Sequence, residues 1–199
     1  DRRVPDVQVD VVRGDSEGGG YEITRLLLSM GHRRIAMLSG PKSVSTAADR
    51  VAGYRRALAE AGVPSDFEMA YYGGYTQESG YRLAKLALSA SPPPTALFAA
   101  NNFIAIGALQ ALREAGLRVP DDMSLVSFDD IPPAFVIEPF LTVVCQPAYE
   151  MGQAATQLLL SRLSGEAPEE PQEIVLPVEV IMRRSCSPIT HPVRRSEIA

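Results

Sequence analysis

The sequence predicts an α/β protein with a parallel β-sheet flanked by helices. Two short apolar runs, 95–100 and 123–128, have the length of buried strands, and the amphipathic pattern between them is typical of a helix. A strand, a helix and a second strand form a right-handed crossover, which makes both strands parallel. Asn101 and Asn102 end the first run, and Asp129 follows the second together with Asp130. We therefore expect both polar pairs at the sheet edge where open α/β sheets bind ligands.

The chain is long enough to bury a core. It has 199 residues, 46% of them hydrophobic, and a net charge of -5. Because phosphate contacts need clustered Lys and Arg, this chain is not expected to bind nucleic acid itself. The sequence has neither an apolar run of about 18 residues nor a secretory leader pattern, so we expect a cytoplasmic chain with no membrane partner.

Cysteine and histidine do not suggest metal chemistry. Cys145 and Cys186 stand singly, without the paired spacing of a zinc site or a disulfide framework, and are interpreted as buried side chains. His32 follows a helix and is interpreted as structural, while His191 is assigned no role. We expect neither a metal nor a cofactor.

The first elements alternate between strand and helix. A half-buried strand is predicted over 7–12, where valines alternate with polar residues, and a helix over 19–30 with Gly31 as its C-cap. The glycine-rich segment 14–20 lacks the spacing of a dinucleotide-binding loop, so we interpret it as a turn that needs unusual dihedral angles. Because the first strand begins so abruptly, we expect further units upstream.

Arg50 is a candidate binding residue. A strand is predicted over 35–39, followed by a helix that a capping box from Thr46 to Asp49 opens and Gly62 ends. Arg50 falls in or next to the first turn, where a cation opposes the helix dipole. A ligand or a carboxylate at the sheet edge would offset that cost; a solvated surface arginine is the alternative.

Tyr75 lies in another strand-to-helix loop. A strand over 67–72 ends in GGYTQESG, and a helix follows over 76–89. An aromatic ring in such a loop stacks on a sugar or a base in many proteins, although plain packing is nearly as common.

Beyond the central crossover, the pattern predicts an irregular loop over 131–139, a strand over 141–145 and a helix over 149–163 with one apolar side. Residues 173–184 form one broken strand or two around Pro177, which suits a sheet edge. From Ser185 on the sequence has no periodicity, and a disordered tail is expected.

Four successive strands thus end in polar or glycine-rich turns at one edge, together with an arginine and an aromatic ring. This arrangement describes a pocket for a small polar ligand. It does not describe a reaction, because no nucleophile motif, P-loop or metal cluster accompanies it. Asp129 and Asp130 would have to act as acid and base, yet adjacent residues after a strand point in different directions, so an enzyme is not expected.

Four motifs also carry a family resemblance: GHRRIAMLSG, ADRVAGYRRAL, LFAANNFIAIGALQALREAGLRVPDDMSLVSFDDI and PFLTVVCQPAYEMGQAA. Together they resemble the effector-binding region of the lactose-repressor and galactose-repressor (LacI/GalR) family of bacterial transcription regulators, from about residue 7 to 184. The resemblance implies a periplasmic-binding-protein-like fold of two Rossmann-like lobes, with crossing strands between them and an effector in the cleft. A sugar or sugar phosphate is the expected effector, with a nucleobase as the alternative.

The resemblance implies roles for individual residues. The implied effector-binding residues are Arg50, Asn101, Asp129, Tyr75, Thr46 and Gln146. Arg50 stands at the family's effector-binding arginine, and Tyr75 at its stacking aromatic position. Asp15 and Ser16 stand where the family often has Asp-Asn, a departure from the pattern. The implied dimer surface contains Gln77, Tyr81, Ile104, Ile106 and Leu109.

The resemblance also implies a division of the chain into lobes, which has five parts. These are the last strand of the N-terminal lobe (1–14), the C-terminal lobe (15–144), a crossing strand and helix of the N-terminal lobe (145–172), closing strands of the C-terminal lobe (173–185) and a flexible tail (186–199). Family members begin with a helix-turn-helix headpiece, which this sequence lacks. We expect a homodimer that reaches DNA only through such a headpiece; an exported sugar-binding protein of a transporter is the alternative.

Overall fold

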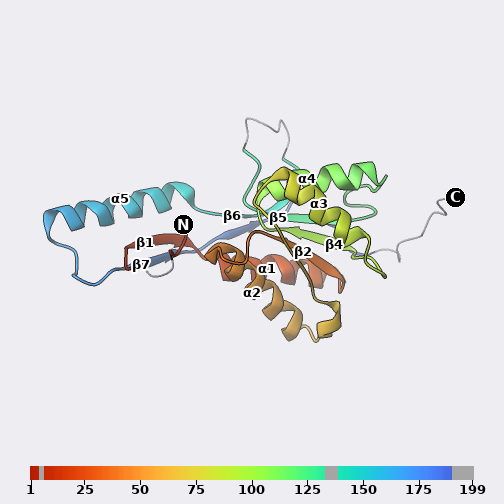
Figure 1. Ribbon diagram of the computed structural model, residues 1–199, viewed down its shortest axis with the longest axis horizontal. Helices are drawn as coiled ribbons and strands as arrows, with labels where there is room; N and C mark the ends of the chain where they lie inside the picture. The colour runs from red at the N-terminus through yellow and green to blue at the C-terminus, as the bar shows by residue number, and fades with distance from the viewer. Residues whose placement is uncertain (5–6, 133–138, 190–199) are drawn as a thin grey trace.

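The computed structural model describes residues 1–4, 7–132 and 139–189, and a six-stranded sheet forms its centre (Figure 1). The strand order is β3-β2-β4-β5-β6-β8. The strands are β2 (Ile35–Ser39), β3 (Met69–Tyr72), β4 (Ala96–Ala99), β5 (Ser124–Phe128), β6 (Thr142–Cys145) and β8 (Glu179–Ile181). All neighbours pair in parallel except β6 and β8, which are antiparallel. The predicted α/β fold with a mostly parallel sheet is confirmed.

Two pairs of helices cover the two faces of this sheet (Figure 1). One pair is α1 (Ser16–Ser29) with α2 (Ser45–Glu60), and the other is α3 (Gln77–Leu88) with α4 (Asn102–Glu114). The chain runs from β2 outward to the edge strand β3 and then back to β4 and β5, so right-handed crossovers place the pairs on opposite faces. Every residue of β2, β4 and β5 is buried, as expected for strands covered on both sides.

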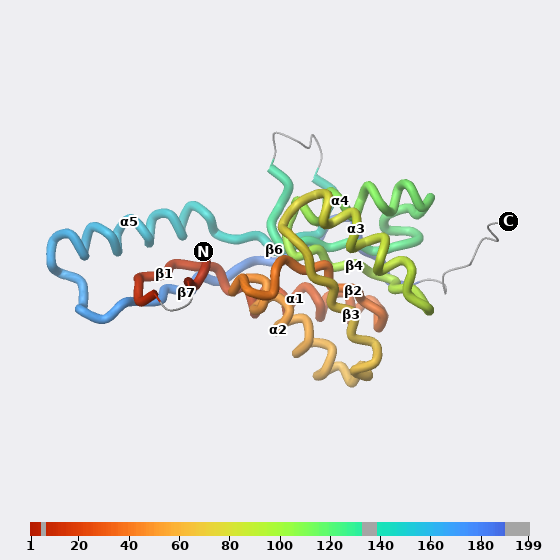
Figure 2. The backbone as a smooth tube through the Cα atoms, viewed as in Figure 1, coloured from red at the N-terminus to blue at the C-terminus, as the bar shows by residue number. Residues whose placement is uncertain are grey.

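A helix and a two-stranded ribbon extend from one end of the sheet (Figure 2). In the ribbon, β1 (Val11–Gly14) pairs in parallel with β7 (Glu173–Leu176), and α5 (Ala148–Ser164) contacts β1. Arg162 of α5 holds the ribbon through Asp10, with nitrogen–oxygen distances of 2.7 and 2.8 Å. We call α5, β1 and β7 together the arm.

The strands of the arm differ from the prediction. The strand expected over 7–12 begins only at Val11, because its partner β7 starts with Glu173 opposite that residue. Two strands flank Pro177, as predicted, but β7 pairs with β1 and β8 with β6. The expected closing segment 173–185 is therefore split between two sheets. A single 3-10 turn (Ser65–Phe67) also replaces the start of the strand predicted over 67–72.

The glycines of segment 14–20 allow close helix packing. Helix α1 already starts at Ser16, and the Asp15 carboxylate caps it by accepting a hydrogen bond from Gly18 N at 2.8 Å. A Cβ on Gly20 would lie 2.5 Å from the backbone oxygen of Arg50 in α2. None of the glycines 18–20 has a positive φ. The interpretation of this segment as a turn with unusual dihedral angles is therefore wrong.

The start of α2 also differs from the prediction. Its N-cap is Val44, which makes no side-chain capping bond, so Thr46 and Asp49 both lie within the helix. The predicted capping box is wrong. Asp49 instead accepts a hydrogen bond from Arg3 at 2.6 Å, and the Thr46 hydroxyl lies 3.4 Å from the hydroxyl of Tyr75.

Residues 185–189 pack against the sheet, so the expectation of disorder from Ser185 on is wrong for this segment. Leu125 N, in β5, donates to the Ser185 carbonyl oxygen at 2.8 Å. Ile189 N donates to the Met30 carbonyl oxygen at 3.0 Å. Cys186 is buried. Residues 190–199, which include His191, and residues 133–138 of the expected loop lie outside the described part of the chain.

His32 joins this packed segment to the sheet, in agreement with its interpretation as structural. Its Nδ1 lies 2.8 Å from Thr95 Oγ1, and its Nε2 lies 3.1 Å from the Ser187 carbonyl oxygen. Burial lowers the pKa of His32, and the contact with Ser187 opposes this shift.

Gly107→Ala is expected to destabilise the protein. The added Cβ would lie 1.9 Å from the backbone oxygen of Gln77 in α3, so helices α3 and α4 would have to separate. Such overpacking costs about 1–3 kcal/mol, which lowers the melting temperature by roughly 2–4 °C per kcal/mol. Gly152→Ala in α5 is the matched control, because its Cβ meets nothing within 4 Å. A melting temperature of Gly107→Ala equal to that of the parent would contradict the packing argument.

Acid is expected to destabilise the fold through His32. Its pKa in the folded protein lies below the value of about 6.5 in the unfolded chain. Around and below that pH the unfolded chain binds more protons, so the free energy of unfolding should fall as the pH drops from about 7 through 6.5, by at most ~1.4 kcal/mol per pH unit. Urea denaturation across this range measures the slope. His32→Gln should remove most of it; a variant with the parent's slope would assign the effect to another group.

Candidate functional site

The carboxyl ends of the parallel strands bring the predicted residues to one edge of the sheet. Because β4 and β5 are neighbours, the pair after β4 lies beside the pair after β5. Asn102 Nδ2 donates to the carbonyl oxygen of Asp130 at 2.9 Å. The predicted juxtaposition of the two polar pairs is confirmed, and we call this edge the rim.

Arg50 is the central residue of the rim. Its side chain is only 3% exposed, and its guanidinium carbon lies 3.6 Å from the centre of the Phe128 ring. Nη1 donates to the Ala100 carbonyl oxygen at 2.6 Å and lies 3.7 Å from Asp129 Oδ2. The carboxylate expected near Arg50 is therefore present, and burial excludes the alternative of a solvated surface arginine.

The Arg50 charge is only partly compensated by its neighbours. Burial lowers the pKa of Arg50, and the nearby Asp129 carboxylate is the largest influence that raises it. At 3.7 Å the contact with Asp129 is an ion pair and not a hydrogen bond. Within the described residues, Arg50 Nε is buried and has no hydrogen-bond partner. The guanidinium thus retains hydrogen-bonding capacity that the protein itself does not use.

Asp129 adopts an unusual backbone conformation that directs its carboxylate toward Arg50. Its φ of 63° lies in the left-handed region, which Asp tolerates better than most residues. Its backbone N donates to the Val144 carbonyl oxygen at 2.9 Å, and its Oδ1 accepts from Gln146 Nε2 at 2.6 Å. The carboxylate is therefore shared between Arg50 and Gln146, and it is 31% exposed.

Tyr75 and Thr46 complete one side of the rim. The Tyr75 ring packs over Gly40, where a Cβ would lie 2.3 Å from a ring carbon. The Tyr75 hydroxyl is 3.4 Å from Thr46 Oγ1, and the Arg2 guanidinium lies 5.8 Å from the ring centre. Thr46 is nearly buried, whereas Tyr75 is partly exposed.

Asn101 has a structural function that limits what it offers to a ligand. It is the N-cap of α4, and its Oδ1 accepts from Ile104 N at 2.9 Å. Its Nδ2 makes no hydrogen bond to any residue that the structure describes. Of the Asn101 side chain, therefore, the Nδ2 amide is the group that can donate to a ligand.

The residues expected on a dimer surface are not all exposed. Gln77 is exposed, and Tyr81, Ile106 and Leu109 are partly exposed on α3 and α4. Ile104 is 0% exposed, because its side chain points from α4 into the core. The expectation that Ile104 offers surface area is wrong.

Two residues of the rim were missed by the sequence analysis. Phe128, the last residue of β5, supports the Arg50 guanidinium, and its position directly before Asp129 was the available signal. Arg183 binds Asp130 in a two-pronged ion pair, with its Nη1 2.8 Å from Asp130 Oδ1. No local pattern predicts this pair, because the two residues are 53 positions apart.

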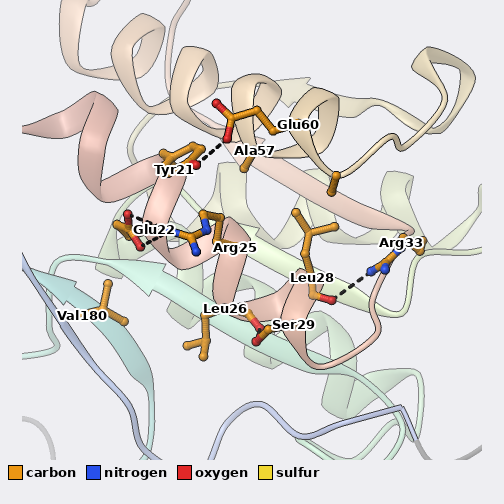
Figure 3. A pocket seen from close by; sticks show the side chains of 11 residues that line it. Tyr21, Glu22, Arg25, Leu26, Leu28, Ser29, Arg33, Ala57, Glu60 and Val180 are labelled. Carbon is orange, nitrogen blue, oxygen red and sulfur yellow. Dashed lines mark hydrogen bonds and ion pairs between the residues drawn. The ribbon is translucent and has the colours of Figure 1, made fainter.

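A separate hollow of about 740 Å³ lies beside α1 and α2 (Figure 3). Its polar side chains are largely paired with one another: the Tyr21 hydroxyl donates to Glu60 at 2.5 Å, and Arg25 lies 3.4 Å from Glu22. None of the predicted effector-binding residues lines it. The rim therefore remains the better candidate site.

Residues 1–4, 7–132 and 139–189 contain neither a metal-binding cluster nor a membrane-spanning helix. No group of three or more His, Cys, Asp or Glu in these ranges is arranged to hold a metal ion. No helix there is both long and apolar enough to cross a membrane. Cys145 and Cys186 are free thiols.

Comparison with known proteins identifies the family. The model of the periplasmic binding protein-like domain matches residues 24–186. The HTH-type transcriptional regulator CelR of Thermobifida fusca is 39% identical over 182 residues, which cover 92% of this chain and 53% of CelR. The chain spans about half the length of the curated relatives it matches.

Solved structures agree with this assignment. A LacI transcriptional regulator from a Rhodococcus species superimposes with a TM-score of 0.86 and 32% identity, covering 95% of this chain and 69% of that one. A complex of the regulator CelR with cellobiose gives a TM-score of 0.83 and 38% identity, covering 92% of this chain and 55% of that one. The chain therefore belongs to the periplasmic binding protein-like domain family, in the form found in LacI-family transcriptional regulators.

Proposed function

We propose that this chain is the effector-binding part of a bacterial transcription regulator, and that its effector is a sugar or sugar phosphate held at the rim. The observation that carries the proposal is the linked cluster of Arg50, Asp129 and Gln146 at the carboxyl ends of the parallel strands. The likeness to a CelR structure with cellobiose supports a sugar as the ligand class.

The chemistry of the rim suits neighbouring hydroxyl groups. A carboxylate accepts hydrogen bonds and a guanidinium donates them, so Asp129 and Arg50 together match hydroxyls that do both. The half-exposed Tyr75 ring offers an aromatic face for the apolar side of a sugar. The roles proposed for Thr46, Asn101 and Gln146 are secondary: Thr46 orients Tyr75, Asn101 donates its amide, and Gln146 orients Asp129.

The rim would contact a bound effector from one side only, so we propose that a second lobe completes the site. The arm exposes large apolar side chains that a water-soluble domain normally covers: Leu159, Leu160 and Leu163 on α5 and Val175 on β7. In the relatives, about twice as much chain is present. In the proposed protein, an N-terminal lobe packs on the arm and closes the cleft, and the chain of 199 residues alone binds sugar weakly.

Effector binding would act on DNA by changing how the two lobes are arranged. A ligand shifts such an equilibrium only as far as it prefers one arrangement, and the same coupling energy appears in operator affinity. DNA contact belongs to a helix-turn-helix headpiece, as the names of the relatives suggest, and such a protein works in the cytoplasm. The matches to regulators favour this proposal over a sugar-binding protein of a transporter. An enzymatic role has no support in them.

Asp129→Asn is expected to weaken or abolish the effector response in the regulator that contains this chain, while operator affinity without effector stays roughly unchanged. Asparagine keeps the size of the side chain and tolerates the left-handed backbone of Asp129, so mainly the charge that faces Arg50 is lost. Thermal shift against mono- and disaccharides, including cellobiose, identifies the effector first, because 100-fold excess over Kd stabilises the protein by about 2.7 kcal/mol. Fluorescence anisotropy with operator DNA then measures the response.

Asp122→Asn is the matched control for this experiment. Asp122 also pairs with an arginine, Arg118, at 2.8 Å, but the pair lies on the surface after α4 and away from the rim. Its loss should leave sugar binding and the operator response unchanged. A full response in the Asp129→Asn variant would show that the effector binds elsewhere.

Leu109→Glu is expected to convert a dimer to monomers. We propose a homodimer surface on α3 and α4 made by Gln77, Tyr81, Ile106 and Leu109, with Phe103, 48% exposed, in place of the buried Ile104. A charge buried in such a surface without a partner opposes association. Sedimentation velocity measures the state, with Leu86→Glu, an exposed leucine on α3, as control. An unchanged dimer in the Leu109→Glu variant would refute this surface, provided that melting temperatures match.

A further inference from the structure

Asp130 is the member of the acidic pair to which neither the sequence nor the proposed function assigns a role. Its carboxylate forms a two-pronged ion pair with Arg183, in which Nη1–Oδ1 is 2.8 Å and Nη2–Oδ2 is 2.5 Å. Ile131 N donates to the same carboxylate at 2.9 Å, and Asn102 Nδ2 donates to the Asp130 carbonyl oxygen at 2.9 Å. Both the side chain and the backbone of Asp130 are thus fixed.

Arg183 is itself held by neighbouring groups of the sheet. Its Nη1 also donates to the Leu141 carbonyl oxygen at 3.0 Å, and its backbone N donates to Thr142 Oγ1 at 2.9 Å. Arg183 follows β8, the strand that continues from β7 of the arm and pairs with β6. The guanidinium therefore connects the chain that leaves the arm to the loop after β5.

The residue next to Asp130 needs such a support. Among the described residues other than glycine, Asp129 alone has a positive φ, a conformation that is unfavourable for most L-residues. In this orientation of the loop, its carboxylate reaches both Arg50 and Gln146. The backbone of Asp129 is thus bordered by two fixed points, the bond from its own N to the Val144 carbonyl oxygen and the contacts of Asp130.

We propose that the Arg183–Asp130 ion pair is a positioning device, which holds Asp129 in its left-handed conformation within reach of Arg50 and Gln146 and thereby links the strands of the arm to the rim. The significance for ligand binding rests on the proposed function, in which Asp129 contacts the effector. The positioning itself is independent of any ligand. Asp130 and Arg183 are positioning residues, because they act through Asp129.

A purely stabilising role is the competing explanation. Exposed ion pairs contribute little to stability, as expected for Arg118 with Asp122, where the Arg118 side chain is 70% exposed. The side chains of Arg183 and Asp130 are 18% and 29% exposed, and both make further bonds to the backbone. The two explanations differ in whether Asp129 moves when the pair is removed.

The side-chain amide of Gln146 reports the position of Asp129 without a ligand. Its Nε2 donates to Asp129 Oδ1 at 2.6 Å, so its proton and nitrogen resonances depend on that contact. In heteronuclear NMR spectra of the whole chain, Arg183→Gln should shift these resonances toward those of a free glutamine amide. Arg183→Lys, which keeps the charge but loses the two-pronged geometry, should give a smaller shift. Arg118→Gln is the matched control and should leave them in place.

The Gln146 resonances distinguish a positioning role of the ion pair from a purely stabilising one. A folded Arg183→Gln variant with unshifted Gln146 resonances would overturn it and leave a stabilising pair only. Should that variant fail to fold, Asp130→Asn removes the charge without changing the shape of the side chain, and the same shift is expected; its absence overturns the proposal equally.

Measuring sugar affinity then tests whether the Arg183–Asp130 ion pair affects effector binding. In the longer regulator, with the sugar that raises the melting temperature of the parent, Arg183→Gln should weaken binding by roughly tenfold, similar to the effect of partners that orient ligands at metal sites. Unchanged affinity together with shifted Gln146 resonances would refute the role in binding. If the parent binds no sugar, the proposed function fails, whereas the NMR result still decides the positioning.

Discussion

A buried positive charge at the edge of the sheet constrains the structure around it. The Arg50 side chain extends from α2 and lies against the Phe128 ring of β5. It donates to the carbonyl oxygen of the residue after β4 and pairs with Asp129. A guanidinium taken out of water is unfavourable unless such partners surround it. Three elements must therefore meet at one point, and a shift of any of them would leave a charge or a carbonyl group unsatisfied.

The packing of α1 against α2 determines the position of Arg50. Helices α1 and α2 approach so closely that a Cβ on Gly20 or Gly53 would collide with the backbone of the partner helix, and Gly80 and Gly107 have the same function between α3 and α4. Each pair of helices is thus set by two glycines. Because Gly20 touches the backbone of Arg50 itself, the spacing of α1 and α2 directly determines where the guanidinium begins.

The conformation of the loop after β5 depends on contacts other than helix packing. Asp129 has a left-handed backbone and donates to Val144 of β6, while its neighbour Asp130 pairs with Arg183 in the chain after β8. Gln146, which hydrogen-bonds to the Asp129 carboxylate, lies just before Pro147, the N-cap of the arm helix α5. The rim is therefore connected to the arm along two routes, through Gln146 and through Arg183.

Local sequence patterns were enough to predict the alternation of strands and helices, the parallel sheet, and the edge at which Arg50, Tyr75, Asn101 and Asp129 gather. These follow from apolar runs and from polar residues at strand ends, which are local signals. Four features become evident only from the three-dimensional contacts: the close helix packing at the glycines of segment 14–20, the burial of Ile104, the pairing of β7 with β1 and the packing of the chain after Ser185. Such features depend on contacts between residues far apart in the chain, as for Asp130 and Arg183, and no local pattern encodes them.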